Sequence, residues 1–164
     1  MPNRRTYEPD RDLLSPNKNI SPITSELDGN NRLTIGGCLL SDLAKSYGTP
    51  LYVIDEETVR TACLAYRNAL KKYYPGKSLP IYASKANSSL VMSSIISSEG
   101  FGLDAVSEGE LLTALRGGVP RENIVLHGNN KSDAELIFAY ENDITIVVDN
   151  YHDIERLSEL IQID

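Results

Sequence analysis

The chain has 164 residues, 41% of them apolar and 24% charged, which is typical of a globular protein with one ordinary core. Its formal net charge of −7 argues against a nucleic-acid or anionic-membrane partner, because either would favour a clustered basic face. The two cysteines, Cys38 and Cys63, have neither a metal-binding spacing nor the pattern of a disulfide framework. Since no apolar run approaches the roughly 18 residues that span a bilayer, we expect a cytoplasmic protein that acts on a small molecule.

The first fifth of the chain differs in composition from the rest. Residues 1–31 are rich in Pro, Asn, Ser and Asp and have few large apolar side chains. Because such a segment cannot bury enough apolar surface to order itself, we expect a flexible leader. Residues 32–50 follow, with a predicted strand at 33–35, a Gly-Gly turn and a short helix that glycine and proline end. Residues 51–55, LYVID, are typical of a further strand.

A regular alternation of helices and strands begins at about residue 58. Apolar side chains recur at helical spacing over residues 58–74, which predicts one amphipathic helix. Apolar strands follow, each succeeded by a helical pattern, at residues 79–84, 101–106, 123–127 and 144–149.

Residues that favour helix starts follow these strands. Ser107 with Glu110 and Ser132 with Glu135 have the spacing of a capping box, in which each side chain accepts a hydrogen bond from the other residue's backbone. Asn150 is placed to cap the last helix. The pattern therefore consists of repeated units of one strand and one helix.

The spacing and apolar character of the strands predict a parallel sheet. The strands begin about 21 residues apart, which is the length of one βα unit. They are apolar on both faces, so the alternatives are an open doubly wound sheet and a barrel. An eight-unit barrel that starts near residue 79 would extend to about residue 247, so this chain would hold its first half.

Polar residues gather where the strands end. Ligands of parallel βα folds lie at the carboxyl ends of the strands. The polar residues at these positions are Lys85, Asn87, Asp104, Ser107, Glu108, His127, Asn129, Asn130, Lys131 and Asp149. A lysine in such a pocket is desolvated, which lowers its pKa and favours the neutral amine that condenses with an aldehyde. Asp104 is placed to orient that amine or a cofactor nitrogen, and His127, Asn129 and Asn130 to orient a polar ligand.

Ordinary structural explanations exist for the same residues. Lys85 can be a solvated loop residue, since a lysine after a strand is more often that than catalytic. Asp104 can cap a turn, and the residues HGNN can be turn chemistry with a positive φ at Gly128 or Asn129.

Five segments together resemble a known family. GTPLYVID, YASKAN, GLDAVSEGEL, GVPRENIVLHGNNKS and ITIVVDN follow in an order and spacing that resemble the diaminopimelate decarboxylases, which are pyridoxal-phosphate enzymes of the alanine-racemase-like fold. The resemblance covers roughly residues 32–160 and does not extend to residues 1–31. HGNNKS resembles the diaminopimelate branch more than the ornithine or arginine decarboxylases.

The resemblance implies a fold, a reaction and site residues. The fold would be the N-terminal part of a pyridoxal-phosphate-binding (β/α)8 TIM barrel over residues 51–164, with residues 32–50 associated with the family's β-domain. The reaction would convert meso-2,6-diaminopimelate to L-lysine and carbon dioxide. The resemblance implies Lys85 as the Schiff-base lysine, Asp104 and His127 as further cofactor-binding residues, and Asn129 and Asn130 as substrate-binding residues, with no metal.

The family's later motifs do not follow Asp149 in this sequence. These are a histidine motif like HxGSQ, a glycine-rich turn for the cofactor phosphate, an acidic partner for the pyridine nitrogen, and a C-terminal β-domain with substrate-binding Arg and Tyr. We therefore expect a truncated N-terminal part that does not decarboxylate by itself, and a homodimer for the complete enzyme. Two alternatives stay open: an inactive fragment that only binds pyridoxal phosphate or a partner, and a decarboxylase of another basic amino acid.

Overall fold

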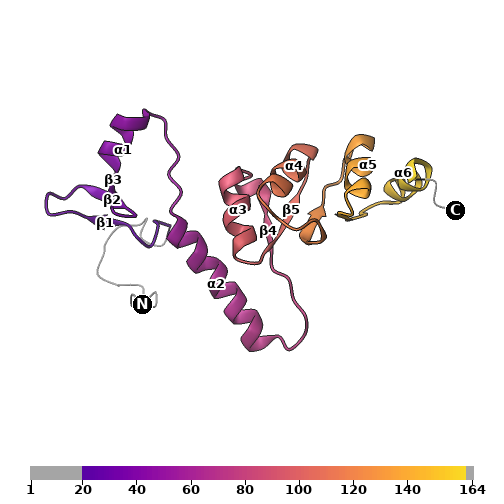
Figure 1. The fold of residues 1–164 in the computed structure, drawn as a ribbon, viewed down its shortest axis with the longest axis horizontal. Coiled ribbons are helices and arrows are strands. Elements are labelled where there is room, and N and C mark those ends of the chain that lie inside the picture. Colours follow the sequence, from indigo (N-terminus) through magenta and orange to yellow (C-terminus); the bar gives the residue numbers. More distant parts are fainter. Residues whose placement is uncertain (1–19, 162–164) are drawn as a thin grey trace. The chain divides into compact units, whose positions relative to one another are not determined.

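The computed structural model describes residues 20–161. The chain divides into two compact units, Met1–Thr61 and Ala62–Asp164, and helix α2 (Glu56–Tyr73) runs through the division. Figure 1 labels the elements of both units. Among the described residues, no helix is both long enough and apolar enough to cross a membrane.

The first unit contains a small antiparallel sheet of order β1-β2-β3. Its elements are β1 (Glu26–Leu27), β2 (Leu33–Ile35), β3 (Cys38–Leu39) and the helix α1 (Leu40–Tyr47). Gly36 and Gly37 join β2 to β3 with φ values of 57° and 76°, which favour glycine and match the twist of a tight hairpin. The predicted strand at residues 33–35 and the Gly-Gly turn after it are confirmed.

Two features of the first unit differ from the sequence analysis. Residues 1–19 of the expected leader lie outside the described residues, but residues 26–27 form β1 and pair with β2. The turn between β1 and β2 is stabilised by the Asp28 carboxylate, which accepts from the backbone of Arg32 at 2.9 Å. Overall composition does not reveal such a specific hydrogen bond, so it does not predict the pairing. Residues 51–55 form no strand; Asp55 instead caps α2 by accepting from the Thr58 backbone at 3.1 Å.

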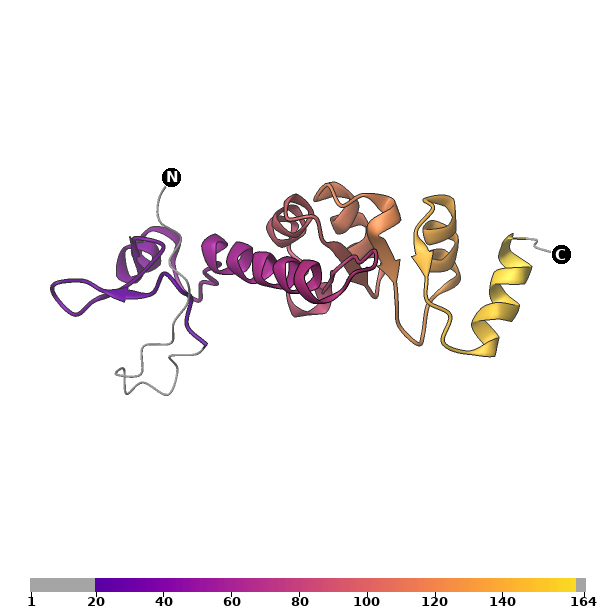
Figure 2. The same cartoon turned by 90° about the horizontal axis from the view of Figure 1, so that it is seen from below.

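The second unit contains the predicted parallel sheet, of order β4-β5-β6-β7. The strands are β4 (Ile81–Ala83), β5 (Gly102–Ala105), β6 (Ile124–Leu126) and β7 (Thr145–Ile146). The helices α3 (Leu90–Ser98), α4 (Glu108–Arg116), α5 (Asp133–Glu141) and α6 (Tyr151–Ile161) follow the strands in turn. Figures 1 and 2 show α3, α4 and α5 side by side along the sheet. The expected βα repeat is confirmed.

The two faces of this sheet are buried to different extents. Leu103 and Ile124 are fully buried beneath the helices, where α4 contributes Leu111 and Ala114 to the same core. The opposite face carries Ala83, Asp104, Val125 and Thr145 in register, and each of them is exposed or only partly buried in this unit. Strands that are apolar on both faces belong in a sheet whose second face also becomes buried, as in a barrel.

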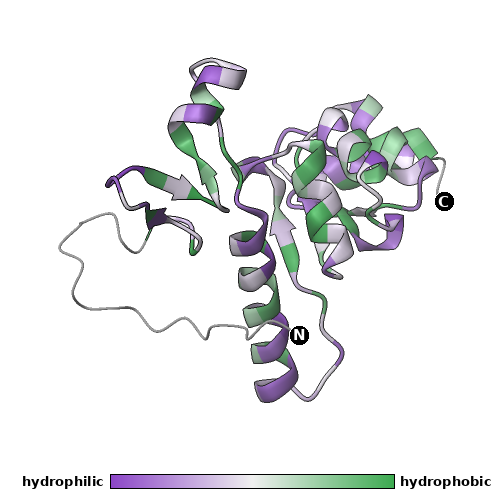
Figure 3. Ribbon diagram, turned by 60° about the vertical axis from the view of Figure 1, so that its left-hand side comes forward, coloured by the Kyte–Doolittle hydropathy of each residue, from purple (hydrophilic) through white to green (hydrophobic). Residues whose placement is uncertain are grey.

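The amphipathic helix predicted at residues 58–74 is confirmed as α2. In Figure 3 this long helix alternates between hydrophilic and hydrophobic segments. Cys63 is its buried residue, and Pro75 follows the helix closely, which fits the expected stop.

The helix starts follow the predicted caps with one difference. Ser132 and Glu135 form a complete capping box, with 2.7 Å between the Ser132 backbone nitrogen and Glu135 Oε2. Asn150 caps α6 by accepting from the Asp153 backbone at 2.8 Å. Ser107 accepts from the Glu110 backbone, but the Glu110 carboxylate reaches past Ser107 to the backbone of Val106. The predicted box at Ser107 is therefore only half formed.

Glu135 also joins two helix starts, because its second carboxylate oxygen accepts from the Glu108 backbone at 3.3 Å. Burial raises the pKa of Glu135, but the hydrogen bonds from Ser132 and Glu108 outweigh it and hold this pKa below its usual value.

We predict that Glu135→Gln reduces the loss in the free energy of unfolding that occurs as the pH falls below neutral. A depressed folded-state pKa contributes stability that is present above the unfolded pKa of about 4.3 and is lost as pH falls through the folded pKa. Urea unfolding between about pH 7 and pH 3 should show a smaller stability loss in the variant than in the wild type. Glu122→Gln, at an exposed site, is the control, and equal slopes for Glu135→Gln and wild type would contradict the assignment.

Candidate active site

Lys85 lies in a short 3-10 turn, η1 (Ser84–Ala86), directly after β4. The Tyr82 hydroxyl ties this turn to the strand by donating to the Asn87 carbonyl at 3.2 Å, and burial raises the pKa of that hydroxyl. Ser84 is buried against the rest of the unit, whereas the Lys85 side chain is exposed, so the expected desolvation of this lysine is not found among the residues that the structure describes. The turn is therefore fixed at both ends, and the amine projects from a held backbone at the carboxyl edge of the sheet.

Asp104 lies on β5, on the less covered face of the sheet and in register with Ala83. Its Oδ1 atom is buried and has no hydrogen-bond partner among the residues that the structure describes. A buried carboxylate oxygen without a donor costs about 1–3 kcal/mol or more, so such atoms need an explanation. A ligand that brings a donor or a positive charge to this face would satisfy it.

His127, Asn129 and Asn130 form the turn after β6, and all three are exposed. The His127 backbone donates to the Ala105 carbonyl at 2.8 Å and so extends the ladder between β5 and β6 by one residue. Gly128 has a φ of 110°, which confirms the expectation of a positive φ in this turn.

Strand register brings these residues to one edge. Ala83 pairs with Asp104, and Lys85 follows two residues after Ala83. Ala105 pairs with Leu126, and His127 comes next. Because parallel strands end at the same edge, the predicted site residues share the face on which ligands of such folds bind.

Sequence reasoning missed an ionic cluster beside this edge. Lys131 is buried, with 2.7 Å between its Nζ and Asp153 Oδ2 and 3.2 Å to Asp149 Oδ1, and it donates to the Gly128 carbonyl. Lys131 and Asp149 were recognised as polar residues after strands, but no local pattern pairs residues 18 and 22 positions apart.

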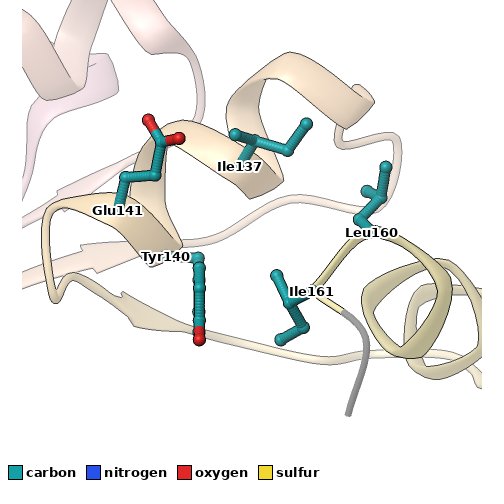
Figure 4. A pocket seen from close by; sticks show the side chains of 5 residues that line it. All are labelled: Ile137, Tyr140, Glu141, Leu160 and Ile161. Carbon is teal, nitrogen blue, oxygen red and sulfur yellow. The ribbon is translucent and has the colours of Figure 1, made fainter.

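A pocket lies away from this edge, between α5 and α6 (Figure 4). Its lining residues are Ile137, Tyr140, Glu141, Leu160 and Ile161. These residues belong to the carboxyl-terminal parts of the two helices, and helices of a βα unit run back along the strands, so this part lies toward the amino ends of the strands. The pocket is therefore not part of the candidate site.

Comparison with known families identifies the fold. Residues 56–163 match the model of the pyridoxal-dependent decarboxylase family, pyridoxal binding domain. The chain belongs to this family. The fold is thus the α/β fold of its N-terminal part, as the sequence analysis expected.

Curated relatives and solved structures agree. The chain is 43% identical over 154 residues to a diaminopimelate decarboxylase of Synechocystis sp., an alignment that covers 89% of this chain and 33% of the relative. It is 44% identical over 138 residues to the diaminopimelate decarboxylase of Bacillus subtilis, covering 84% and 31%. A crystal structure of diaminopimelate decarboxylase from M. jannaschii, in co-complex with L-lysine, superposes with a TM-score of 0.79 at 34% identity, covering 85% and 33%. The chain spans about a third of the length of these relatives.

The residues at the carboxyl edge fit a pyridoxal cofactor. Such a cofactor offers an aldehyde to an amine, and a nearby carboxylate can orient that amine. Lys85 supplies an exposed amine at this edge, and Asp104 supplies a buried oxygen that no described residue satisfies with a donor.

We predict that Asp104→Asn stabilises the protein in the absence of pyridoxal phosphate, by about 1 kcal/mol, because it removes a partly buried charge with an unsatisfied oxygen. The same variant should bind pyridoxal phosphate more weakly. Urea unfolding and fluorescence titration measure the two effects. Glu122→Gln, at an exposed position, should change neither, and a loss of cofactor-free stability in Asp104→Asn would contradict the prediction.

Proposed function

We propose that this chain is the cofactor-binding part of a decarboxylase that converts meso-2,6-diaminopimelate to L-lysine and carbon dioxide. The observation that carries the proposal is the position of Lys85 beside Asp104 at the carboxyl edge of the parallel sheet. The similarity to diaminopimelate decarboxylases over more than four fifths of this chain supports the substrate.

Each site residue has a role in this proposal. Lys85 attaches the cofactor through its amine, and Asp104 holds a donor of the cofactor or of the lysine against its unpaired oxygen. His127 contacts the cofactor from the next loop along the edge. When bound, pyridoxal phosphate supplies the ring that accepts the electron pair left by the departing carboxylate.

Asn129 and Asn130 bind the substrate in this proposal. Their exposed amides present both donors and acceptors at the carboxyl edge, which suits an amino acid with several ammonium and carboxylate groups. A homodimer, a cytosolic location and the division of the chain at residues 31 and 50 stay predictions.

We predict a single covalent attachment point for the cofactor. After addition of pyridoxal phosphate and reduction with borohydride, peptide mass mapping should find the adduct on Lys85, because this lysine follows a strand end near Asp104, whose Oδ1 has no hydrogen-bond partner in the described part of the chain. Lys85→Ala should remove the adduct, whereas Lys77→Ala, at an exposed site, should keep it. An adduct on another lysine would contradict the assignment of Lys85.

A second prediction concerns the substrate and uses the complete decarboxylase of which this chain is, in this proposal, the cofactor-binding part, supplied with pyridoxal phosphate. Carbon dioxide release should occur with meso-2,6-diaminopimelate and should be absent in Lys85→Ala. Release with ornithine or arginine in its place would show that another basic amino acid is the substrate. Formation of the Lys85 adduct without release from any of the three would leave a binding role alone.

A further inference from the structure

Lys131 is a buried cation that the proposed chemistry does not use. Its side chain is 1% exposed, and the Asp153 side chain beside it is 3% exposed. Taking an ammonium out of water costs several kcal/mol unless it is paired and fully hydrogen-bonded. An apolar residue of similar length would often be at least as stable at such a position, so stability alone does not account for a lysine here.

The ammonium of Lys131 stabilises the turn that precedes it in the chain. It donates to the carbonyl of Gly128, the residue of positive φ in the turn that carries His127, Asn129 and Asn130. An apolar side chain at position 131 could not replace this contact, because the Gly128 carbonyl accepts a hydrogen bond and an apolar side chain has no donor.

The same ammonium ties this loop to the next one. Asp149 follows β7, and Asp153 lies in the first turn of α6, so both carboxylates belong to the following βα unit. Burial raises the pKa of Asp149, but the hydrogen bond and the charge of Lys131, together with hydrogen bonds to Asp153 and Asn150, outweigh burial and hold this pKa below its usual value. The contact with Asp153 is an ion pair at 2.7 Å without hydrogen-bond geometry.

A second cation fixes the backbone of Lys131. Arg156 of α6 donates through Nη1 to the Lys131 carbonyl at 2.6 Å and pairs with Asp133 at the start of α5. Both the side chain and the main chain of Lys131 are therefore anchored to α6. The turn at residues 127–130 is therefore held by Lys131, which is itself fixed by Asp149, Asp153 and Arg156.

We propose that Lys131 is a positioning residue that orients Asn129 and Asn130 for the substrate through the Gly128 carbonyl and the Asp149–Asp153 pair. The inference rests on the proposed function, since it assigns a substrate to these two amides. Lys131 itself is enclosed and paired, so it acts on the turn and not on the substrate directly.

The test compares Lys131→Met with Lys71→Met, an exposed lysine on α2, in the complete decarboxylase to which this chain is proposed to belong. In Lys131→Met, backbone amides of residues 128–131 should exchange with deuterium faster while those of β4 and β5 keep their rates. The Lys85 adduct should form to the wild-type extent, and the KM for meso-2,6-diaminopimelate should rise about tenfold or more, because misplaced binding groups weaken substrate binding. Lys71→Met should match the wild type in all three measurements.

The outcomes separate this inference from the proposed function. No turnover in the wild-type protein overturns both. Normal wild-type turnover with an unchanged KM in Lys131→Met overturns the positioning role alone, as does a folded Lys131→Met variant that no longer forms the Lys85 adduct. If Lys131→Met does not fold, Asp153→Asn decides: a smaller KM rise with an intact adduct supports the inference, and an unchanged KM overturns it.

Discussion

The hydrogen-bonded register of the parallel strands is the constraint on which the rest of the second unit depends. Because Ala83, Asp104 and Val125 stand side by side, the segments after the strands are brought to a common edge. Lys85 and the turn from His127 come from sequence positions about forty residues apart, yet both follow strands of the same parallel sheet and so lie at the same edge. A slip of one residue in either pairing would turn Asp104 into the helix-covered core, where its carboxylate would be far more costly.

The two faces of the sheet have different roles. The helix-covered face holds a fully buried apolar core around Leu103 and Ile124, which supplies the stability. The other face carries Asp104 with an unsatisfied oxygen, and the loops above it carry exposed amides and an exposed amine. Stability is thus concentrated away from the edge at which ligands of such folds bind, and the polar groups there are positioned by backbone geometry and by the buried charge of Lys131.

Features set by neighbouring residues were predictable. The βα repeat follows from local apolar periodicity, and the capping box of Ser132 and Glu135 follows from a spacing of three residues. Features that depend on partners distant in the sequence were not predictable. Residues 51–55 have strand composition but no ladder in the structure, and residues 26–27 have leader composition but pair with β2. The Glu110 carboxylate accepts from the Val106 backbone and not from the expected Ser107 backbone, because the local helix geometry and not the sequence spacing decides which donor lies within reach.

The sequence by itself determined the parallel α/β class, the family, and the candidate residues Lys85, Asp104, His127, Asn129 and Asn130, because each of these follows from short motifs and their order. Only the tertiary structure decided that, within residues 20–161, Asp104 keeps a buried oxygen without a donor and that Lys131 is enclosed between Asp149 and Asp153. Burial and ion pairing arise from segments folded together in space, and a linear pattern carries no information on the distance between them.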